Sequence, residues 1–322
     1  SGVSENDLGE IIVSPINWMT DISSITTCGF KPVFADINMQ NLAVDMSEIR
    51  KCITEKTRAI NLTHIMGFNG LSDDLLSLCK ERNIMLIEDC CESHGATFNG
   101  KKVGSFGDMS VFSFYYGHHM TTIEGGMVCT NDDNIHQILR LIRSHGLVRE
   151  LTDDRLKSHY YDENPIPAPE FVFAIPGFNF RGTEIGGVLG IQQLTRLDKI
   201  VTSRRDNFKQ YLSLLDPSIY KIDFDVKGNS NFGLIAVLND PDSDVINTLT
   251  EKLEQNSIAF RRGIVGGGNQ LRQPYLKHLN IPPEKFPNAE HIHNYSLYIG
   301  NHQFITTQDI EKITTLANSC RH

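Results

Sequence analysis

The stretch of sequence that decides the fold is MLIEDCCESH, residues 85–94. Its apolar residues run directly into Glu88 and Asp89, and a polar turn follows. A short apolar run bounded by turn residues is typical of a buried strand in a parallel sheet. Ligands on such sheets bind beyond the carboxyl ends of the strands. The sequence therefore predicts a candidate site at Asp89.

The first half of the chain repeats this alternation of short apolar runs and helical patterns. The alternation predicts an α/β fold, with a mostly parallel sheet covered by helices on both faces. The predicted strands are residues 11–13, 32–36, 57–64, 85–89, 110–115 and 126–130, and the predicted helices are about 20–28, 46–53, 73–82 and 134–144.

The second half predicts a smaller α+β unit. Residues 151–180 are polar and rich in proline, which predicts a long loop. The patterns after this loop are a long helix at 183–214, a β-rich run at 221–238, a helix at 244–255, a glycine-dense turn at 263–268 and a final helix at 307–317. We expect a large domain over residues 1–199 and a small C-terminal domain over residues 200–322.

Charge and composition narrow the class of function. The 322 residues carry a formal net charge of −9, which argues against nucleic acid or an anionic membrane surface as the main partner. The sequence has neither a membrane-spanning apolar run nor a signal-peptide pattern, so we expect a cytoplasmic protein. The seven cysteines include no C-x-x-C pair, and we expect reduced structural thiols and no metal site.

Each candidate residue has an ordinary structural explanation beside a functional one. Asp89 either caps the following turn or pairs with a buried cation. The position of Glu92, taken alone, predicts an exposed carboxylate in a turn. Ser113 ends a β-rich run, where a hydroxyl either bonds to backbone or binds a phosphate. Trp18 is either a core residue or a stacking platform. His118, in SFYYGHHMTTIEGG (residues 113–126), is either a packed histidine or a proton carrier with a pKa near neutral.

Together these segments resemble the DegT/DnrJ/StrS family of sugar-nucleotide aminotransferases, which use pyridoxal phosphate (PLP), over nearly the whole chain. Residues 113–126 resemble the family's cofactor-anchoring loop, whose lysine binds PLP covalently and lies five residues after a serine; here Ser113 is followed by His118. Residues 176–184, PGFNFRGTE, resemble the loop before the family's long helix. In the family its asparagine, Asn179 here, reaches the cofactor phosphate of the neighbouring subunit. The resemblance therefore implies a homodimer with an active site shared between subunits.

The resemblance also implies a fold and a set of roles. The fold is the PLP-dependent transferase fold type I, with a seven-stranded, mostly parallel sheet. Asp89 would pair with the cofactor's ring nitrogen, Glu92 would lie near its ring hydroxyl, and Trp18 would stack on the ring. Ser113 would bind the cofactor phosphate. His118, which cannot bind PLP covalently, would be the catalytic base.

Histidine in place of lysine marks, within this family, the 3-dehydratases that make 3,6-dideoxyhexoses. One branch of them binds an iron–sulfur cluster through closely spaced cysteines after an Arg-Ser-His-Gly segment. Here residues 143–146 have that sequence, and no cysteine follows before Cys320. The resemblance thus implies the cluster-free branch, which acts on a GDP-linked 4-keto-6-deoxyhexose in deoxysugar biosynthesis for lipopolysaccharide. Pyridoxamine phosphate (PMP) would be the working form of the cofactor, and L-glutamate the amino donor.

Family members have several dozen residues before the first strand, including a Gly-Ser-Ser or Gly-Thr-Ser turn that binds the cofactor phosphate. Only about ten residues precede the first predicted strand here, so we expect an N-terminal segment to be missing from this sequence. Two alternatives to the dehydratase stay open. One is a sugar-nucleotide aminotransferase that tolerates histidine, and the other is a catalytically inactive dimeric relative or fragment.

Overall fold

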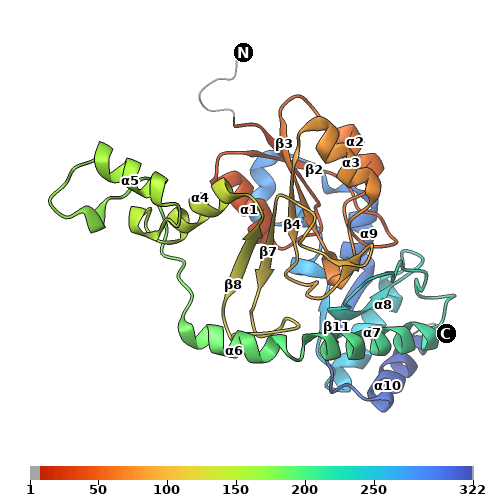
Figure 1. The fold of residues 1–322 in the computed structure, drawn as a ribbon. Helices are drawn as coiled ribbons and strands as arrows, with labels where there is room; N and C mark the ends of the chain where they lie inside the picture. The colour runs from red at the N-terminus through yellow and green to blue at the C-terminus, as the bar shows by residue number, and fades with distance from the viewer. Residues whose placement is uncertain (1–7, 321–322) are drawn as a thin grey trace.

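The computed structural model describes residues 8–320, which form an α/β fold around a six-stranded sheet (Figure 1). Its strand order is β2-β1-β3-β4-β7-β8, and all neighbours are parallel except β8, which runs antiparallel to β7. The mostly parallel sheet agrees with the prediction, but the described residues contribute six strands to it, not seven. These strands are β1 (Glu10–Val13), β2 (Lys31–Phe34), β3 (Thr57–Thr63), β4 (Met85–Asp89), β7 (Met109–Ser113) and β8 (Gly126–Thr130).

Core residues cover both faces of this sheet. Successive side chains of a strand point to opposite faces. Ile12 of β1 accordingly belongs to one apolar cluster, while Ile11 and Val13 belong to another. Strand β1 is therefore buried on both faces, as the sequence pattern predicted for the strands of this sheet. The helices of this part of the chain are α1 (Met19–Thr27), α2 (Met46–Cys52), α3 (Asp73–Arg82) and α4 (Asp133–Arg143).

A second, antiparallel sheet forms from the C-terminal part of the chain, with strand order β10-β11-β9. The boundary predicted between residues 199 and 200 falls inside helix α7, and the exact division into two domains stays a prediction. The elements are α7 (Leu197–Leu214), β9 (Gly233–Val237), α8 (Ser243–Gln255), β10 (Phe260–Arg262), α9 (Pro287–Tyr295), β11 (Ser296–Gly300) and α10 (Thr307–Asn318). A two-stranded ribbon, β5 (Thr97–Phe98) and β6 (Lys101–Lys102), lies between β4 and β7 in the chain.

Three local expectations were wrong. The loop predicted over residues 151–180 contains helix α5 (Asp154–Glu163), whose N-cap Asp153 accepts hydrogen bonds from two backbone N–H groups of the first turn. The helix predicted from 183 to 214 is broken into α6 (Glu184–Leu194) and α7 at Thr195 and Arg196. Of the β-rich run predicted over residues 221–238, only Gly233–Val237 forms a strand, β9. Short 3-10 helices cover Ile65–Gly67, Val148–Glu150, Pro169–Phe171, Val265–Gly267, Gln270–Arg272, Pro274–Leu279 and Pro283–Lys285.

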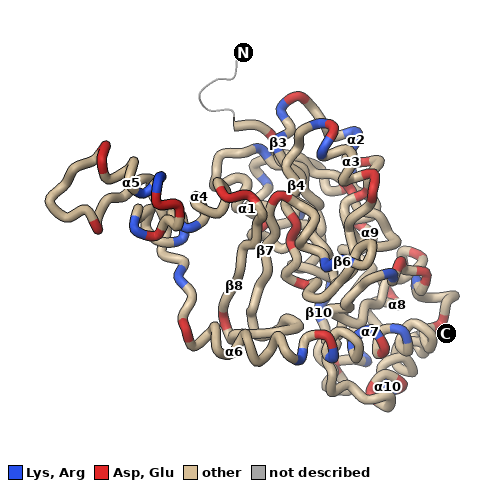
Figure 2. The backbone as a smooth tube through the Cα atoms, in the orientation of Figure 1, with Lys and Arg blue, Asp and Glu red and all other residues tan. Residues whose placement is uncertain are grey.

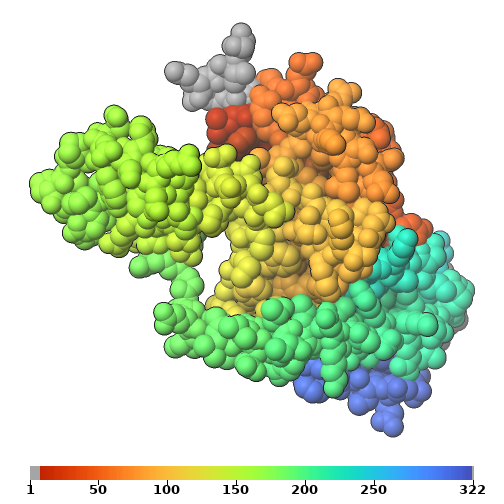
Figure 3. All heavy atoms as spheres, in the orientation of Figure 1, coloured from red at the N-terminus to blue at the C-terminus, as the bar shows by residue number. Residues whose placement is uncertain are grey.

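Helices α4 and α5 form an arm that projects from the body, and the chain returns from it to α6 (Figure 1). The space-filling view shows open space between this arm and α6 (Figure 3). Charged residues of both signs are dispersed along the arm and α7, whereas α6 is almost free of charge (Figure 2). Within residues 8–320, no helix combines the length and the apolar character needed to cross a membrane.

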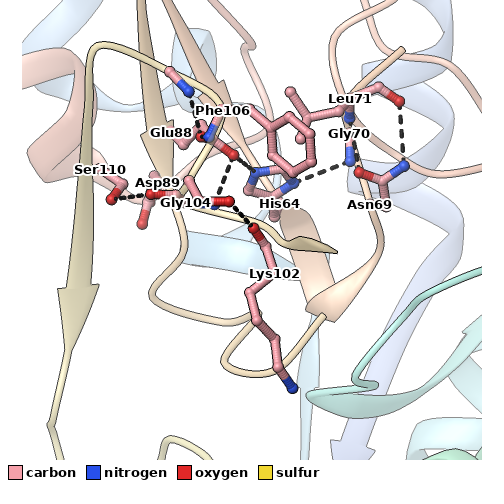
Figure 4. Close-up of polar contacts among 12 residues, drawn as sticks. His64, Asn69, Gly70, Leu71, Glu88, Asp89, Lys102, Gly104, Phe106 and Ser110 are labelled. Carbon is pink, nitrogen blue, oxygen red and sulfur yellow. Dashed lines mark hydrogen bonds and ion pairs between the residues drawn. The ribbon is translucent and has the colours of Figure 1, made fainter. Parts of the chain in front are cut away.

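A buried carboxylate, Glu88, connects three segments beneath the end of β4 (Figure 4). One oxygen accepts hydrogen bonds from His64 Nε2 (3.1 Å) and the Gly104 N–H (2.7 Å). The other accepts from the N–H groups of Phe106 (2.9 Å) and Gly107 (2.7 Å). Burial alone would raise the pKa of Glu88, but the bonds from His64 and the backbone outweigh it and lower that pKa. Glu88 thus joins the end of β3 to the loop that leads into β7.

We expect Glu88→Gln to destabilise the fold by about 3 kcal/mol or more, because each Glu88 oxygen accepts two hydrogen bonds and the new amide N–H would face donors. The measurement is urea unfolding followed by circular dichroism. Glu251→Gln, on the exposed face of α8, is the matched control and should leave the midpoint unchanged. Equal midpoints for Glu88→Gln and the control would contradict this role.

Candidate active site

The carboxyl ends of the parallel strands bring most of the predicted site residues together. Thr63 of β3 pairs with Asp89 of β4, which in turn pairs with Val111 of β7, two residues before Ser113. Residues that leave these strands therefore share one edge of the sheet, as the sequence predicted for a ligand site. The predicted site residues on these segments are Trp18, Asp89, Glu92, Ser113 and His118.

Asp89 is buried at the end of β4, and one of its oxygens accepts the Cys91 N–H at 2.9 Å. Within residues 8–320 no lysine or arginine forms an ion pair with it. A buried carboxylate is costly without a compensating partner. The site therefore suits a ligand that brings a positive charge or a hydrogen-bond donor to Asp89.

Glu92 is half-buried and is not the exposed turn carboxylate that its isolated position suggested. Its carboxyl accepts the Met66 N–H at 2.9 Å. Burial raises the pKa of Glu92 to about 8; the nearby negative charge of Asp89 adds to this, and the Met66 bond and Arg261 oppose it. At neutral pH the group keeps its proton and can donate a hydrogen bond to a ligand oxygen.

His118 lies on the loop after β7, where its backbone N–H bonds to the Tyr115 carbonyl at 3.1 Å. Its Nδ1 is buried and has no hydrogen-bond partner among the described residues. Burial lowers the pKa of His118 to about 4, below the near-neutral value expected from sequence; Asp89 acts to raise it and Arg204 to lower it. The imidazole is therefore neutral at pH 7 and able to accept a proton.

Sequence reasoning missed the buried groups that surround His118. The rings of His94 and Phe232 lie 5.9 and 5.5 Å from its ring, centre to centre. The buried Arg204 donates to the Phe232 carbonyl at 3.0 Å, and burial lowers the pKa of this guanidinium to about 10. Burial, His118 and Arg204 lower the pKa of His94 to about 3. The helical pattern that contains Arg204 gave no sign that this side chain turns inward.

Trp18 is 54% exposed and is the N-cap residue of α1, so it is not a core residue. Its backbone N–H donates to Asn17 Oδ1 at 2.8 Å, and the same oxygen lies 3.1 Å from the Thr63 hydroxyl. The glycine-dense turn packs against this segment: Gly266 has φ +59°, and a Cβ there would lie 2.5 Å from the Asn17 carbonyl oxygen. These contacts fix the backbone of Trp18 beside β3, where its indole is free to cover a ligand.

Ser113 lies at the strand ends with the other candidates, whereas Asn179 lies apart from them. The Ser113 hydroxyl lies at the end of β7 and accepts the Tyr115 N–H at 3.3 Å. Asn179 instead forms a bridge with Ser144 at the end of α4, and its side-chain oxygen accepts Arg181 Nε at 2.6 Å. Asn179 therefore sits where the arm leads toward α6, apart from the strand ends that gather the other candidates.

A possible metal cluster, His64, Glu88 and Cys90, lies beneath the site, with ligand atoms within 4.8 Å of one another. His64 Nδ1 already accepts the Gly70 N–H at 3.0 Å, so its proton is on Nε2, which faces Glu88. Both Glu88 oxygens are engaged by donors. Burial raises the pKa of the Cys90 thiol. These groups act as a structural network and do not present free ligands.

Comparison with known proteins then gives the family. The model of the DegT/DnrJ/EryC1/StrS aminotransferase family matches residues 2–317. This chain belongs to that family. The resemblance seen in the sequence is thereby confirmed, and PLP is the cofactor of the family. The chain is an enzyme of the PLP-dependent sugar aminotransferase family.

Individual relatives of this family member differ in their reactions. The chain is 32% identical over 304 residues to GDP-4-keto-6-deoxy-D-mannose 3-dehydratase of Escherichia coli O55:H7, covering 94% of this chain and 78% of the relative. It is also 32% identical over 262 residues to GDP-perosamine synthase of Vibrio cholerae, covering 81% and 66%. A crystal structure of GDP-4-keto-6-deoxymannose-3-dehydratase, in a histidine-to-asparagine form with bound GDP-perosamine, matches with TM-score 0.87 and 30% identity, covering 97% of this chain and 81% of that one. The predicted fold class is confirmed by this match.

The residues of this family member fit PLP or PMP. Asp89 lacks a cationic partner among the described residues, Glu92 keeps a proton to donate, and the buried Nδ1 of His118 is unpaired. A pyridine ring nitrogen, a ring hydroxyl and a transferable proton are the complementary groups. Residue 118 is a histidine and cannot bind the cofactor covalently as a lysine would.

We expect the free energy of unfolding of the cofactor-free protein to fall between about pH 6.5 and 8. The Glu92 carboxyl has its pKa raised on folding, so its stabilising effect is complete below its usual value and is lost as pH rises to about 8. Buried His94 and His118 have lowered pKa values and act in the opposite direction, but only below about pH 6.5.

Glu92→Gln should remove about 2 kcal/mol of this fall, because it removes the titrating group while its amide oxygen still accepts the Met66 N–H. Urea unfolding at several pH values is the measurement, with Glu251→Gln as control. An unchanged pH slope in Glu92→Gln would show that Glu92 is ionised in the folded protein.

Proposed function

We propose that this protein is a 3-dehydratase acting on a GDP-linked 4-keto-6-deoxyhexose, a lyase of deoxysugar biosynthesis for lipopolysaccharide. The observation that carries the proposal is His118 at the position of the family's lysine, five residues after Ser113 and close enough to Asp89 to be affected by its charge. The similarity to E. coli GDP-4-keto-6-deoxy-D-mannose 3-dehydratase supports the same substrate class.

Each residue of the site has a proposed role toward the cofactor or the substrate. Bound PMP supplies an amine for the sugar ketone and a ring that takes up electrons. Asp89 holds the ring nitrogen, Glu92 donates a hydrogen bond to the ring hydroxyl, and Trp18 covers the ring. His118 Nδ1 or Nε2 removes a proton and returns it to the departing C3 hydroxyl group of the sugar, which leaves as water. The Ser113 hydroxyl binds the cofactor phosphate.

L-Glutamate is proposed as the donor that restores PMP, as in the family's aminotransferases. No iron–sulfur cluster is proposed to take part, since the sequence after residues 143–146 contains no cysteine before Cys320. Burial also raises the pKa of thiols near the site, such as Cys90 and Cys91, which disfavours the thiolate that a cluster requires.

A homodimer is proposed, with helix α6 as part of the interface. Val188 and Ile191 of α6 are each 65% exposed, although the helix carries a single charged residue. Several exposed apolar side chains on one helix are typical of an interaction site. Helix α6 also packs on the loop of His118, because a Cβ on Gly190 would lie 3.4 Å from the Thr122 methyl. A second subunit here would bring its Asn179 segment toward the cofactor phosphate of the first.

The second candidate is a sugar-nucleotide aminotransferase. It is favoured by the similarity to V. cholerae GDP-perosamine synthase, which has the same 32% identity as the dehydratase. The two reactions give different products from one substrate. The dehydratase releases a 3-deoxy sugar, whereas the aminotransferase releases a sugar with an amino group at C4.

The His118 variants test the proposal directly. We expect His118→Asn to lower formation of the 3-deoxy sugar by roughly 100- to 10,000-fold, since it removes the proton carrier. We expect His118→Lys to hold PLP covalently, so that borohydride fixes the cofactor to the protein and shifts its absorbance. The measurements are mass spectrometry of the nucleotide sugars and absorbance spectra, with exposed His136→Asn as the control.

Full dehydration by His118→Asn would overturn the role of His118. A glutamate-dependent amino sugar as the product of the unmodified protein would overturn the dehydratase in favour of the aminotransferase. Absence of PLP and PMP binding would favour the inactive dimeric relative.

The dimer is tested with paired acidic substitutions on α6. We expect Val188→Asp with Ile191→Asp to give a monomer in sedimentation velocity, because two charges would be buried in the interface. PLP affinity should fall with it, since the partner's phosphate contact is lost. Phe304→Asp is the control, because Phe304 is 77% exposed and lies outside α6. A dimer that persists in the α6 variant would place the interface elsewhere.

A further inference from the structure

A second carboxyl group, that of Asp21, lies against Asp89. Asp21 is in the first turn of α1, three residues after Trp18, and its side chain is within hydrogen-bonding reach of the Asp89 carboxyl. The Thr63 hydroxyl, from the strand residue that pairs with Asp89, lies 3.0 Å from Asp21 Oδ2. The two carboxyl groups therefore meet at the junction of α1, β3 and β4.

Within residues 8–320, no lysine or arginine is among the groups that act on Asp21. The Thr63 hydroxyl lies within hydrogen-bonding distance of it, and Cys91 and Tyr275 are near enough to be affected by its charge. The groups that respond to Asp89 in turn are Cys90, Glu92 and His118. None of these supplies a fixed positive charge between the two carboxyls.

Asp89 is buried and Asp21 half-buried, and two carboxylates this close cannot both be ionised at modest cost, so one keeps a proton. Burial and the charge of Asp89 raise the pKa of Asp21 well above its usual range, and the polar groups of Thr63 and Asn17 oppose this only in part. A position in the first turn of a helix normally favours the carboxylate form. Here the adjacent carboxylate and the lack of solvent outweigh the helix dipole.

We propose that Asp21 remains protonated at neutral pH and acts as a positioning residue, donating a hydrogen bond that orients the Asp89 carboxylate toward the ring nitrogen of the cofactor. The inference rests on the role proposed above for Asp89, but not on the dehydration reaction. One Asp89 oxygen accepts the Cys91 N–H, and the Asp21 hydroxyl adds a second fixed donor. Asp89 then has a single orientation, in the way that a hydrogen-bond partner fixes the orientation of a metal-binding side chain.

The proton is observable without any sugar substrate. We expect an infrared carbonyl band of a protonated carboxyl group in cofactor-free protein at neutral pH, measured in a Glu92→Gln background because Glu92 also keeps its proton. The band should disappear when Asp21→Asn is added, and Asp244→Asn, an exposed first-turn aspartate of α8, should leave it in place. Persistence of the band in the Asp21→Asn protein would overturn the proposal.

Positioning is tested by the affinity for PLP, titrated by absorbance. Asp21→Asn retains a donor of similar shape and should bind PLP within about twofold of the unmodified protein, whereas Asp21→Leu removes the donor and should bind about tenfold more weakly. Equal weakness of both variants would mean that Asp21 acts through a negative charge, and full affinity in Asp21→Leu would remove the positioning role. Loss of dehydratase activity alone tests the proposed function and leaves this inference untouched. If Asp21→Leu does not fold, the infrared band, measured with and without Asp21→Asn, still tests whether Asp21 carries the proton.

Discussion

The geometry of the site depends on the buried carboxylate of Glu88. Neighbouring residues of a strand point to opposite faces, so Glu88 is directed into the sheet's packing while Asp89 is directed to the ligand edge. Four donors from β3's end and the loop before β7 converge on Glu88. A shift of β4 by one residue would exchange the two carboxylates and leave these donors unpaired. The network therefore fixes the register that presents Asp89.

Above this network the charges of the site are controlled by burial. Asp21 and Glu92 keep their protons because their partial burial and the neighbouring Asp89 disfavour a second and third carboxylate. The histidines stay uncharged for the corresponding reason, with the charge of Arg204 lowering their pKa values further. The outcome is the buried Asp89 carboxylate among mostly uncharged donors and acceptors, with Arg204 as a nearby buried cation. Such a site suits the cationic ring nitrogen proposed for it at a lower cost than a site with several buried carboxylates.

The sequence predicted the parts of this arrangement that follow from local pattern. Asp89 could be found because it ends an apolar run, and His118 because it replaces a lysine in a recognisable loop. Asp21 could not be found in this way, because acidic residues are common in the first turn of a helix. Only the fold brings Asp21 next to Asp89. Glu88 was hidden for a similar reason, since its four donors come from residues 64 and 104–107. Helix α5 was missed because the prolines after it outweighed the capping signal of Asp153.

The low basicity of His118 is consistent with a proton carrier and not with a strong base. Burial sets the pKa near 4, and Asp89 is the group that raises it. A cationic ring nitrogen held by Asp89 would cancel part of that effect and make the imidazole a weaker base still. A proton accepted under these conditions is held weakly, so in the proposed dehydration His118 gives it up readily to the departing hydroxyl group. The same burial of His118 that disfavours proton uptake therefore favours proton delivery. Abstraction of the proton must be driven by the acidity that bound cofactor gives the substrate, whereas delivery of the proton is driven by the low pKa that the protein gives His118.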